Sequence, residues 1–259
     1  MWPNLKQLPY LKEIEPILSK FTPVSLQDIE EVKLMSRIDR KYWFHLSKLP
    51  EILRQTLSDY NILEIEGQRL MDYQTTYFDT FDNEMYMKHH NGNRNRHKVR
   101  KRKYVSTNSS FLEIKFKTNK KVTKKNRIGI EFEKNEFLSE ELAFIQERSP
   151  YHGKKLRPIL NNKFKRLTLI NKKKLDRCTI DIAPSFWDKS NSVKIDNMGI
   201  FELKRGANIK ASPIVTILRN MEIRQRGMSK YCTGRALLDL ELKQNSFKPR
   251  LRFIKEKIN

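Results

Sequence analysis

The sequence predicts an α+β protein built on a closed antiparallel β-barrel of about eight strands, with a charged lumen and helices packed outside. Two observations lead to this prediction. First, β-rich segments along the chain alternate charged and apolar side chains, so each strand has one charged and one apolar face. Second, the charged faces carry both signs, and amphipathic helical segments are present that can cover the apolar faces from outside. For any single strand, a sandwich with its charged face in solvent is the alternative.

Length and charge limit the kind of protein. A chain of 259 residues can bury a sizeable core and fits one large domain better than two. The net charge of +23 exceeds what solubility requires and predicts an anionic partner, which could be nucleic acid, an acidic membrane surface or a phosphate-rich small molecule. Cys178 and Cys232 form no CxxC pair, which indicates a reduced compartment. The start lacks a signal-peptide pattern, and no apolar run approaches the roughly 20 residues that span a bilayer. We therefore expect a cytoplasmic protein, peripheral to a membrane at most.

The elements are predicted from periodicity and turn residues. Residues 5–19 form an amphipathic segment broken by prolines, within an N-terminal helical region over residues 1–30. Strands rich in β-branched, aromatic and alternating residues are predicted at 36–44, 71–78, 96–105, 111–117, 127–133, 164–170, 176–183 and 199–204. Helices are predicted at 47–60, where Ser47 can cap the N-terminus, and at 138–148, 213–224 and 230–242. The barrel domain then covers residues 31–245, and residues 246–259 are expected to form a basic tail.

Strand parity assigns the charged side chains to one face. Arg100 and Arg102 share a face of their strand, whereas Leu112, Ile114 and Phe116 make the apolar face of the next one. The charged faces of the predicted strands contain Arg37, Asp39 and Lys41; Glu113, Lys115 and Lys117; Arg127, Glu131 and Glu133; Arg177 and Asp181; Glu202 and Lys204. Arginine forks match phosphate oxygens through paired N–H donors, so a lumen lined in this way is suited to a polyanion.

A series of short motifs resembles a known family. The motifs are Arg37-Ile-Asp-Arg-Lys-Tyr-Trp-Phe44, Tyr77-Phe-Asp-Thr80, Val99-Arg-Lys-Arg-Lys-Tyr104, Phe111-Leu-Glu-Ile-Lys115, Arg177-Cys-Thr-Ile-Asp181, Phe201-Glu-Leu-Lys204 and Ser229-Lys-Tyr231. In this order they resemble the VTC domain, named after the vacuolar transporter chaperone complex, whose catalytic domain is an inorganic polyphosphate polymerase. The family belongs to the triphosphate tunnel metalloenzymes, and the barrel region 31–245 is accordingly expected to be a VTC-type tunnel domain.

The resemblance implies roles for individual residues. The catalytic, phosphate-binding wall is expected to consist of Lys41, Arg100, Arg102, Lys115, Arg127, Arg166, Arg177 and Lys230, together with Lys204 on the charged face beside Glu202. Further substrate contacts are expected from Arg37, Lys98, Lys117 and Tyr231. Glu202 takes the place of the metal-binding glutamate, with Mn²⁺ or Mg²⁺ as the ion. The superfamily usually opens with Glu-x-Glu-x-Lys, whereas this chain has Arg37-x-Asp39-x-Lys41, which favours the polymerase branch over the triphosphate-hydrolase branch.

The expected reaction transfers the γ-phosphoryl group of ATP, or another nucleoside triphosphate, to a growing inorganic polyphosphate chain and releases ADP. The acceptor is already an anionic oxygen, so the main tasks are positioning and charge neutralisation. A tunnel hydrolase of triphosphate or polyphosphate and a non-catalytic polyanion-binding module remain as alternatives. Nucleic acid is not expected, because Asp39, Glu113, Glu131, Asp181 and Glu202 are interspersed on the charged faces. The SPX and transmembrane parts of eukaryotic VTC subunits are not visible here, so coupling to a membrane would need a separate subunit.

Overall fold

The computed structural model describes residues 9–31, 37–120, 122–132, 136–206 and 212–258. The helices are α1 (Pro9–Leu18), α2 (Leu26–Glu31), α3 (Leu49–Thr56), α4 (Glu84–His90), α5 (Ser139–Arg148), α6 (Pro213–Asn220), α7 (Lys230–Leu238) and α8 (Lys248–Lys257). The longer strands are β2 (Arg37–His45), β4 (Met71–Asp79), β5 (Arg96–Tyr104), β6 (Ser109–Lys117), β7 (Thr123–Gly129), β8 (Arg157–Asn171), β9 (Asp176–Trp187) and β11 (Met198–Gly206). Short strands β1 (Pro23–Val24), β3 (Tyr60–Leu63) and β10 (Ser192–Lys194) add to these.

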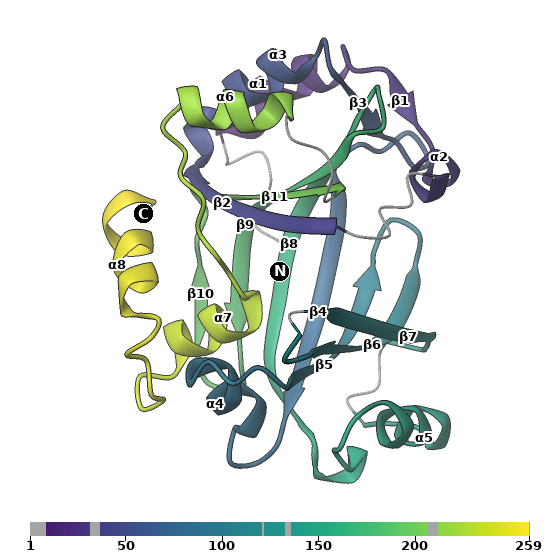
Figure 1. Ribbon diagram of the computed structural model, residues 1–259, viewed down its shortest axis with the longest axis vertical. Coiled ribbons are helices and arrows are strands. Elements are labelled where there is room, and N and C mark those ends of the chain that lie inside the picture. Colours follow the sequence, from purple (N-terminus) through teal and green to yellow (C-terminus); the bar gives the residue numbers. More distant parts are fainter. Residues whose placement is uncertain (1–8, 32–36, 121, 133–135, 207–211, 259) are drawn as a thin grey trace.

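The strands form one large sheet with the order β2-β11-β9-β8-β4-β5-β6-β7, and every neighbouring pair on this path is antiparallel. The sheet curls so that its two edge strands, β2 and β7, both come to the front of the view, with β8 and β9 behind them (Figure 1). Within the described residues, no backbone pairing joins β2 to β7, so hydrogen bonds do not close the sheet. The α+β class and the large antiparallel sheet are confirmed. The predicted closed barrel is not confirmed, because the hydrogen bonds between the described strands leave the sheet open between β2 and β7.

The register of the sheet explains why the charged faces coincide. Residues directly opposite each other in an antiparallel pair project to the same side of the sheet. Opposed pairs on the charged face are Arg100 and Glu113, Glu113 and Arg127, Arg166 and Asp181, Lys204 and Arg177, and Glu202 and Lys41. The cations and carboxylates of seven strands, β2, β5, β6, β7, β8, β9 and β11, therefore lie on one continuous face.

Helices cover the opposite, apolar face in two clusters. Leu112 and Ile114 are fully buried together with Ile145 of α5. Ile180 is likewise fully buried, in a second cluster with residues of α1, α3 and α6 such as Ile52. Burial of such side chains contributes about 1.5–3 kcal/mol each, so the apolar parity holds the helices on the sheet.

Several predicted boundaries differ from the structure; for example, β8 begins at Arg157, seven residues before the predicted start. Strand β7 begins at Thr123 and ends at Gly129, because it pairs along β6 from Phe111 to Lys117. Lys124 and Lys125 therefore belong to the sheet. The expected basic tail forms a packed helix, α8, in which Ile254 is 2% exposed, and Ile258 directly after the helix is 1% exposed. None of the described helices is both long and apolar enough to cross a membrane.

Candidate functional site

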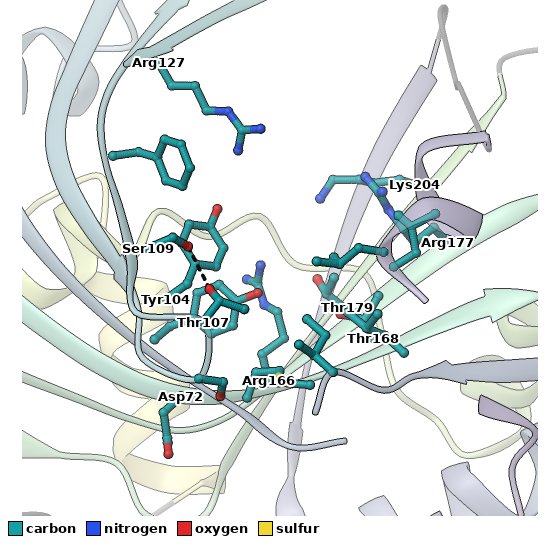
Figure 2. Close-up of a pocket in the computed structure, with 18 residues that line it drawn as sticks. Asp72, Tyr104, Thr107, Ser109, Arg127, Arg166, Thr168, Arg177, Thr179 and Lys204 are labelled. Carbon is teal, nitrogen blue, oxygen red and sulfur yellow. Dashed lines mark hydrogen bonds between the residues drawn. The ribbon is translucent and has the colours of Figure 1, made fainter. Parts of the chain in front are cut away.

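A cavity of about 470 Å³ lies against the charged face of the curled sheet. Four cations line it, and each comes from a different strand: Arg127 from β7, Arg166 from β8, Arg177 from β9 and Lys204 from β11. Figure 2 shows Arg127 on one side of the cavity, Arg177 and Lys204 on the opposite side, and Arg166 between them. Four positive side chains around one space form a site for an anion with several charges.

Carboxylates hold these and neighbouring cations in place. Glu113, whose side chain is 1% exposed, accepts from Arg100 Nε at 2.7 Å and Arg100 Nη2 at 2.6 Å, and it also pairs with Lys125. Asp181 receives two parallel bonds from Arg166, Nε to Oδ1 at 2.5 Å and Nη2 to Oδ2 at 2.9 Å. The ammonium of Lys230, at the start of α7, donates to the same carboxylate.

Glu202 makes the third such cluster. Its Oε1 lies 2.9 Å from Lys41 Nζ and 3.4 Å from Lys204 Nζ. Each of the three carboxylates therefore bridges two cations that come from different positions in the sheet or from a helix. Such bridges fix long, flexible side chains before any ligand arrives, which lowers the entropy lost on binding.

These contacts keep the carboxylates ionised. Burial alone would raise the pKa of Asp181, but Arg166 and Lys230 outweigh it and lower that pKa to about 2. Burial likewise opposes ionisation of Glu202, yet Lys204 and Lys41 hold its pKa well below the ordinary value. All of these groups are acceptors without a proton at neutral pH, and their charge is already committed to cations.

Several lysines of the charged region also have lowered pKa values, and for them burial is the main cause. Burial lowers the pKa of Lys230 to about 8, and the attraction of Asp181 only partly offsets it. Burial also lowers the pKa of Lys98 to about 8, with a further contribution from Lys115. Their charge is therefore sensitive to pH just above neutrality.

Several cations of the charged face lie over aromatic rings. The guanidinium of Arg166 lies 4.8 Å from the ring centre of Tyr73, and that of Arg102 lies 5.8 Å from the same ring. The guanidinium of Arg127 lies 4.6 Å from the ring centre of Phe111. Contacts of this kind are worth about 0.5–2 kcal/mol and help to hold each cation in one orientation.

The structure brings most of the predicted site residues to this region. Arg127, Arg166, Arg177 and Lys204 line the cavity, and Lys41, Arg100 and Lys230 belong to the carboxylate clusters. Arg102 donates from Nε to Thr75 Oγ1 at 3.3 Å, and Lys98 Nζ donates to Ser229 Oγ at 2.7 Å. Lys115 and Lys117 share the parity of Glu113 on β6. Arg37 begins β2 opposite Gly206, and its side chain lies outside the described part of the structure.

Tyr231 does not lie on the charged wall. It is 2% exposed, its ring stacks on Tyr77 with 5.4 Å between centroids, and its hydroxyl donates to Asp79. Tyr231 was predicted to contact the substrate because it belongs to the motif Ser229-Lys-Tyr231. In the structure its side chain packs next to Lys230 in the interior. Asp79 was not singled out from the sequence, although it lies in the motif Tyr77-Phe-Asp-Thr80.

Asp79 connects two helices near the site. It is fully buried and accepts from the backbone N–H groups of Met85 and Tyr86, both at 2.9 Å, in addition to Tyr231. It therefore fixes the start of α4 and the first turn of α7, which carries Lys230. A second missed group is Thr179, which lines the cavity and whose buried Oγ1 has no hydrogen-bond partner among the described residues.

The donor set limits how a metal could be held. Among the described residues, no group of three or more His, Cys, Asp or Glu side chains is arranged to hold a metal ion. Glu202 contacts Lys41 and Lys204 through Oε1, at 2.9 and 3.4 Å. Mg²⁺ commonly binds through one or two carboxylates together with substrate phosphates and water. Glu202 therefore fits a divalent ion that binds together with phosphate, and the described residues do not form a site that would hold one alone.

Comparisons with known proteins agree with this geometry. The family model described as VTC domain matches residues 36–239. Among solved structures, a suspected adenylate cyclase of Bacillus halodurans superposes with a TM-score of 0.50 at 14% identity, covering 75% of this chain and 94% of its own. A suspected adenylyl cyclase of Hippeastrum with a dominant triphosphatase activity gives a TM-score of 0.46 at 15% identity, covering 80% and 100%. The first of these likenesses supports the fold. A search of curated protein sequences found no significant match.

Proposed function

The chain belongs to the VTC domain family, and from this premise we propose that it synthesises inorganic polyphosphate from ATP. The observation that carries the proposal is the cavity lined by Arg127, Arg166, Arg177 and Lys204, with further cations held beside it on carboxylate bridges. A reaction between two polyanions needs dense, fixed positive charge more than any other feature.

The proposed transfer is a single displacement at phosphorus. A terminal oxygen of the polyphosphate chain forms a bond to the γ-phosphorus of ATP. The bond from this phosphorus to the bridging β,γ-oxygen breaks, and ADP leaves with that electron pair. Because the attacking oxygen already carries negative charge, no group of the protein has to remove a proton from it.

The cavity cations have two tasks in this step. They offset the repulsion between the chain end and the triphosphate, and they stabilise the charge that develops on the leaving oxygen. Arg166 offers a planar pair of donors that now binds Asp181, and phosphate oxygens have the same two-point geometry. Preorganised donors of this type contribute roughly 10²- to 10³-fold each to catalysis. With β2 and β7 drawn together around a polyanion, the curled sheet would form the closed tunnel expected from the sequence.

Asp181 and Glu202 are poorly suited to act as the general base that hydrolysis by an unassisted water would need. Water needs a base, or a metal ion, to become a good nucleophile. Asp181 and Glu202 are ionised with lowered pKa values and are bonded to cations, so both are weak bases. An anionic acceptor avoids this requirement. When bound with substrate, Mn²⁺ or Mg²⁺ on Glu202 would add positive charge at the phosphate oxygens. We further propose a cytoplasmic location, with any membrane attachment supplied by a separate subunit.

The test is incubation of the purified protein with ATP and Mn²⁺ or Mg²⁺, followed by gel analysis of polymer and assays for ADP and free phosphate. Polymer with equimolar ADP supports the polymerase. Free phosphate without polymer identifies a tunnel hydrolase, and binding of polyphosphate without turnover identifies a binding module. Arg166→Ala should abolish product formation, whereas Arg148→Ala, which changes an exposed arginine paired with Glu147, should leave it unchanged.

A further inference from the structure

The cavity has two chemically different halves. One half carries Arg166, Arg177 and Lys204, and Arg127 lies where it borders the other half. The other half is apolar and contains aliphatic and aromatic side chains, among them Ile29, Leu63, Met71, Tyr73, Tyr104 and Phe111. In Figure 2, Tyr104 and Arg127 lie on the same side of the cavity, across from Arg177 and Lys204. Inorganic polyphosphate has no apolar surface, so it gives no reason for the second half.

The aromatic half is a fixed surface. Tyr104 meets Tyr73 edge-on with 5.0 Å between ring centroids and meets Phe111 edge-on at 5.7 Å. Tyr73 in turn stacks on Phe164 at 5.2 Å and is only 8% exposed. Tyr104 and Phe111 remain partly exposed, so their ring surface is available to a ligand. Such a rigid aromatic surface costs little entropy when a planar group packs on it.

The two halves meet at Arg127. Its guanidinium lies 4.6 Å from the ring centre of Phe111 and also borders the cationic half. Close by, the hydroxyls of Thr107 and Ser109 lie 2.7 Å apart on the turn between β5 and β6, and both residues line the cavity. Rings, hydroxyl groups and a cation therefore lie next to one another on this part of the cavity wall.

We propose that this aromatic half binds the nucleoside of the nucleoside triphosphate. This inference rests on the proposed function, since it assigns the donor nucleotide its place in the same cavity. The base packs on the ring of Tyr104, beside Phe111, and the triphosphate extends toward Arg166, Arg177 and Lys204. Stacking on a π-face is open to every base, so the surface distinguishes a nucleotide from inorganic triphosphate more strongly than one base from another. A volume of about 470 Å³ lies within the range of roughly 300–1,000 Å³ typical of small-molecule sites.

The experiment compares two ligands that share a triphosphate and differ in the nucleoside. Calorimetry measures the affinity of a non-hydrolysable ATP analogue and of inorganic tripolyphosphate for the parent and for Tyr104→Leu. We expect the substitution to weaken the ATP analogue about tenfold, because a base stacked on an aromatic ring is worth about 1–3 kcal/mol, and to change tripolyphosphate by less than twofold. Tyr104→Phe keeps the ring and should retain the affinity of the parent.

Controls separate this site from general damage. Tyr10→Leu changes a partly buried tyrosine of α1, whose ring contacts His45 at the end of β2. Tyr10 does not line the cavity, so this substitution should alter neither affinity. Thermal unfolding monitored by circular dichroism establishes that each variant is folded. Equal losses for both ligands, or no loss for the ATP analogue, would overturn the nucleoside site. Because binding is measured without turnover, failure to make polymer counts against the polymerase alone and leaves this result standing.

Discussion

Replacing Asp181 by asparagine removes the charge that holds Arg166 and Lys230 in position. The Asp181 side chain is 2% exposed and each partner is 14% exposed, so the loss leaves two largely buried cations without their anion. Breaking a buried ion pair in this way costs about 3–5 kcal/mol. Since Arg166 borders the cavity, we expect the lower end, about 3 kcal/mol. For a chain of this size, that corresponds to a fall in melting temperature of about 6–12 °C.

Tripolyphosphate should reverse much of this loss. Its oxygens can bind the Arg166 fork and the Lys230 ammonium that the asparagine no longer satisfies, so the ligand should raise the melting temperature of Asp181→Asn more than that of the parent. The assay is thermal unfolding by circular dichroism, with and without tripolyphosphate, at fixed ionic strength.

The control is Glu51→Gln, which breaks a pair with Arg54 at 3.4 Å in which both side chains are about half exposed. It should cost less than about 1 kcal/mol and show no extra response to the ligand. If tripolyphosphate stabilised the parent and Asp181→Asn equally, Asp181 would not occupy the position of a phosphate, and the interpretation of its cluster would be wrong.

Further predictions concern the metal, the cavity cations and pH. Glu202→Gln should abolish metal-dependent turnover without unfolding the protein, as judged by product assays and circular dichroism; activity within a few-fold of the parent would move the metal elsewhere. Arg177→Ala should weaken tripolyphosphate binding about 30- to 150-fold in calorimetry, from a charged hydrogen bond worth about 2–3 kcal/mol, whereas the exposed Lys173→Ala should have little effect; equal losses that vanish at high salt would mean diffuse attraction. Since the pKa values of Lys98 and Lys230 are lowered to about 8, tripolyphosphate affinity should fall from pH 7 to pH 9 at constant ionic strength. Unfolded lysines titrate near pH 10.4, so the unfolded state binds more protons between about pH 8 and 10, and these two groups should make the free protein more stable as pH rises through that window.

Side-chain parity made the charged wall predictable. Alternation along one strand fixes which residues share a face, so Arg100, Glu113 and Arg177 could be assigned to the wall without knowledge of the strand order. What parity cannot supply is the register between strands, because register depends on how neighbouring strands and helices pack. The pairing of Asp181 with Arg166, and of Glu202 with Lys41, therefore emerged only from the structure.

Other features were missed for related reasons. Lys125 belongs to the lysine-rich segment 120–125, whose composition is typical of a solvated loop, but it is a wall residue because β7 extends to match β6. Leu251 and Ile254 of α8 and Ile258 directly after it follow a helical spacing, which was detectable despite the basic composition of this segment. The links that Asp79 makes to α4 and α7 join segments far apart in the chain, and no local pattern predicts such a contact.

The unpaired edges of β2 and β7 bear on how a long polymer would be captured under the proposed function. No backbone ladder joins these two strands among the described residues, so a movement that separates them breaks no such hydrogen bonds. A sealed ring can be threaded only from a terminus, and a long polyphosphate molecule has very few termini but many internal segments. An opening between β2 and β7 would let an internal segment of the polymer enter from the side. The rate of capture per molecule would then grow with the length of the polymer, whereas threading would make it independent of length.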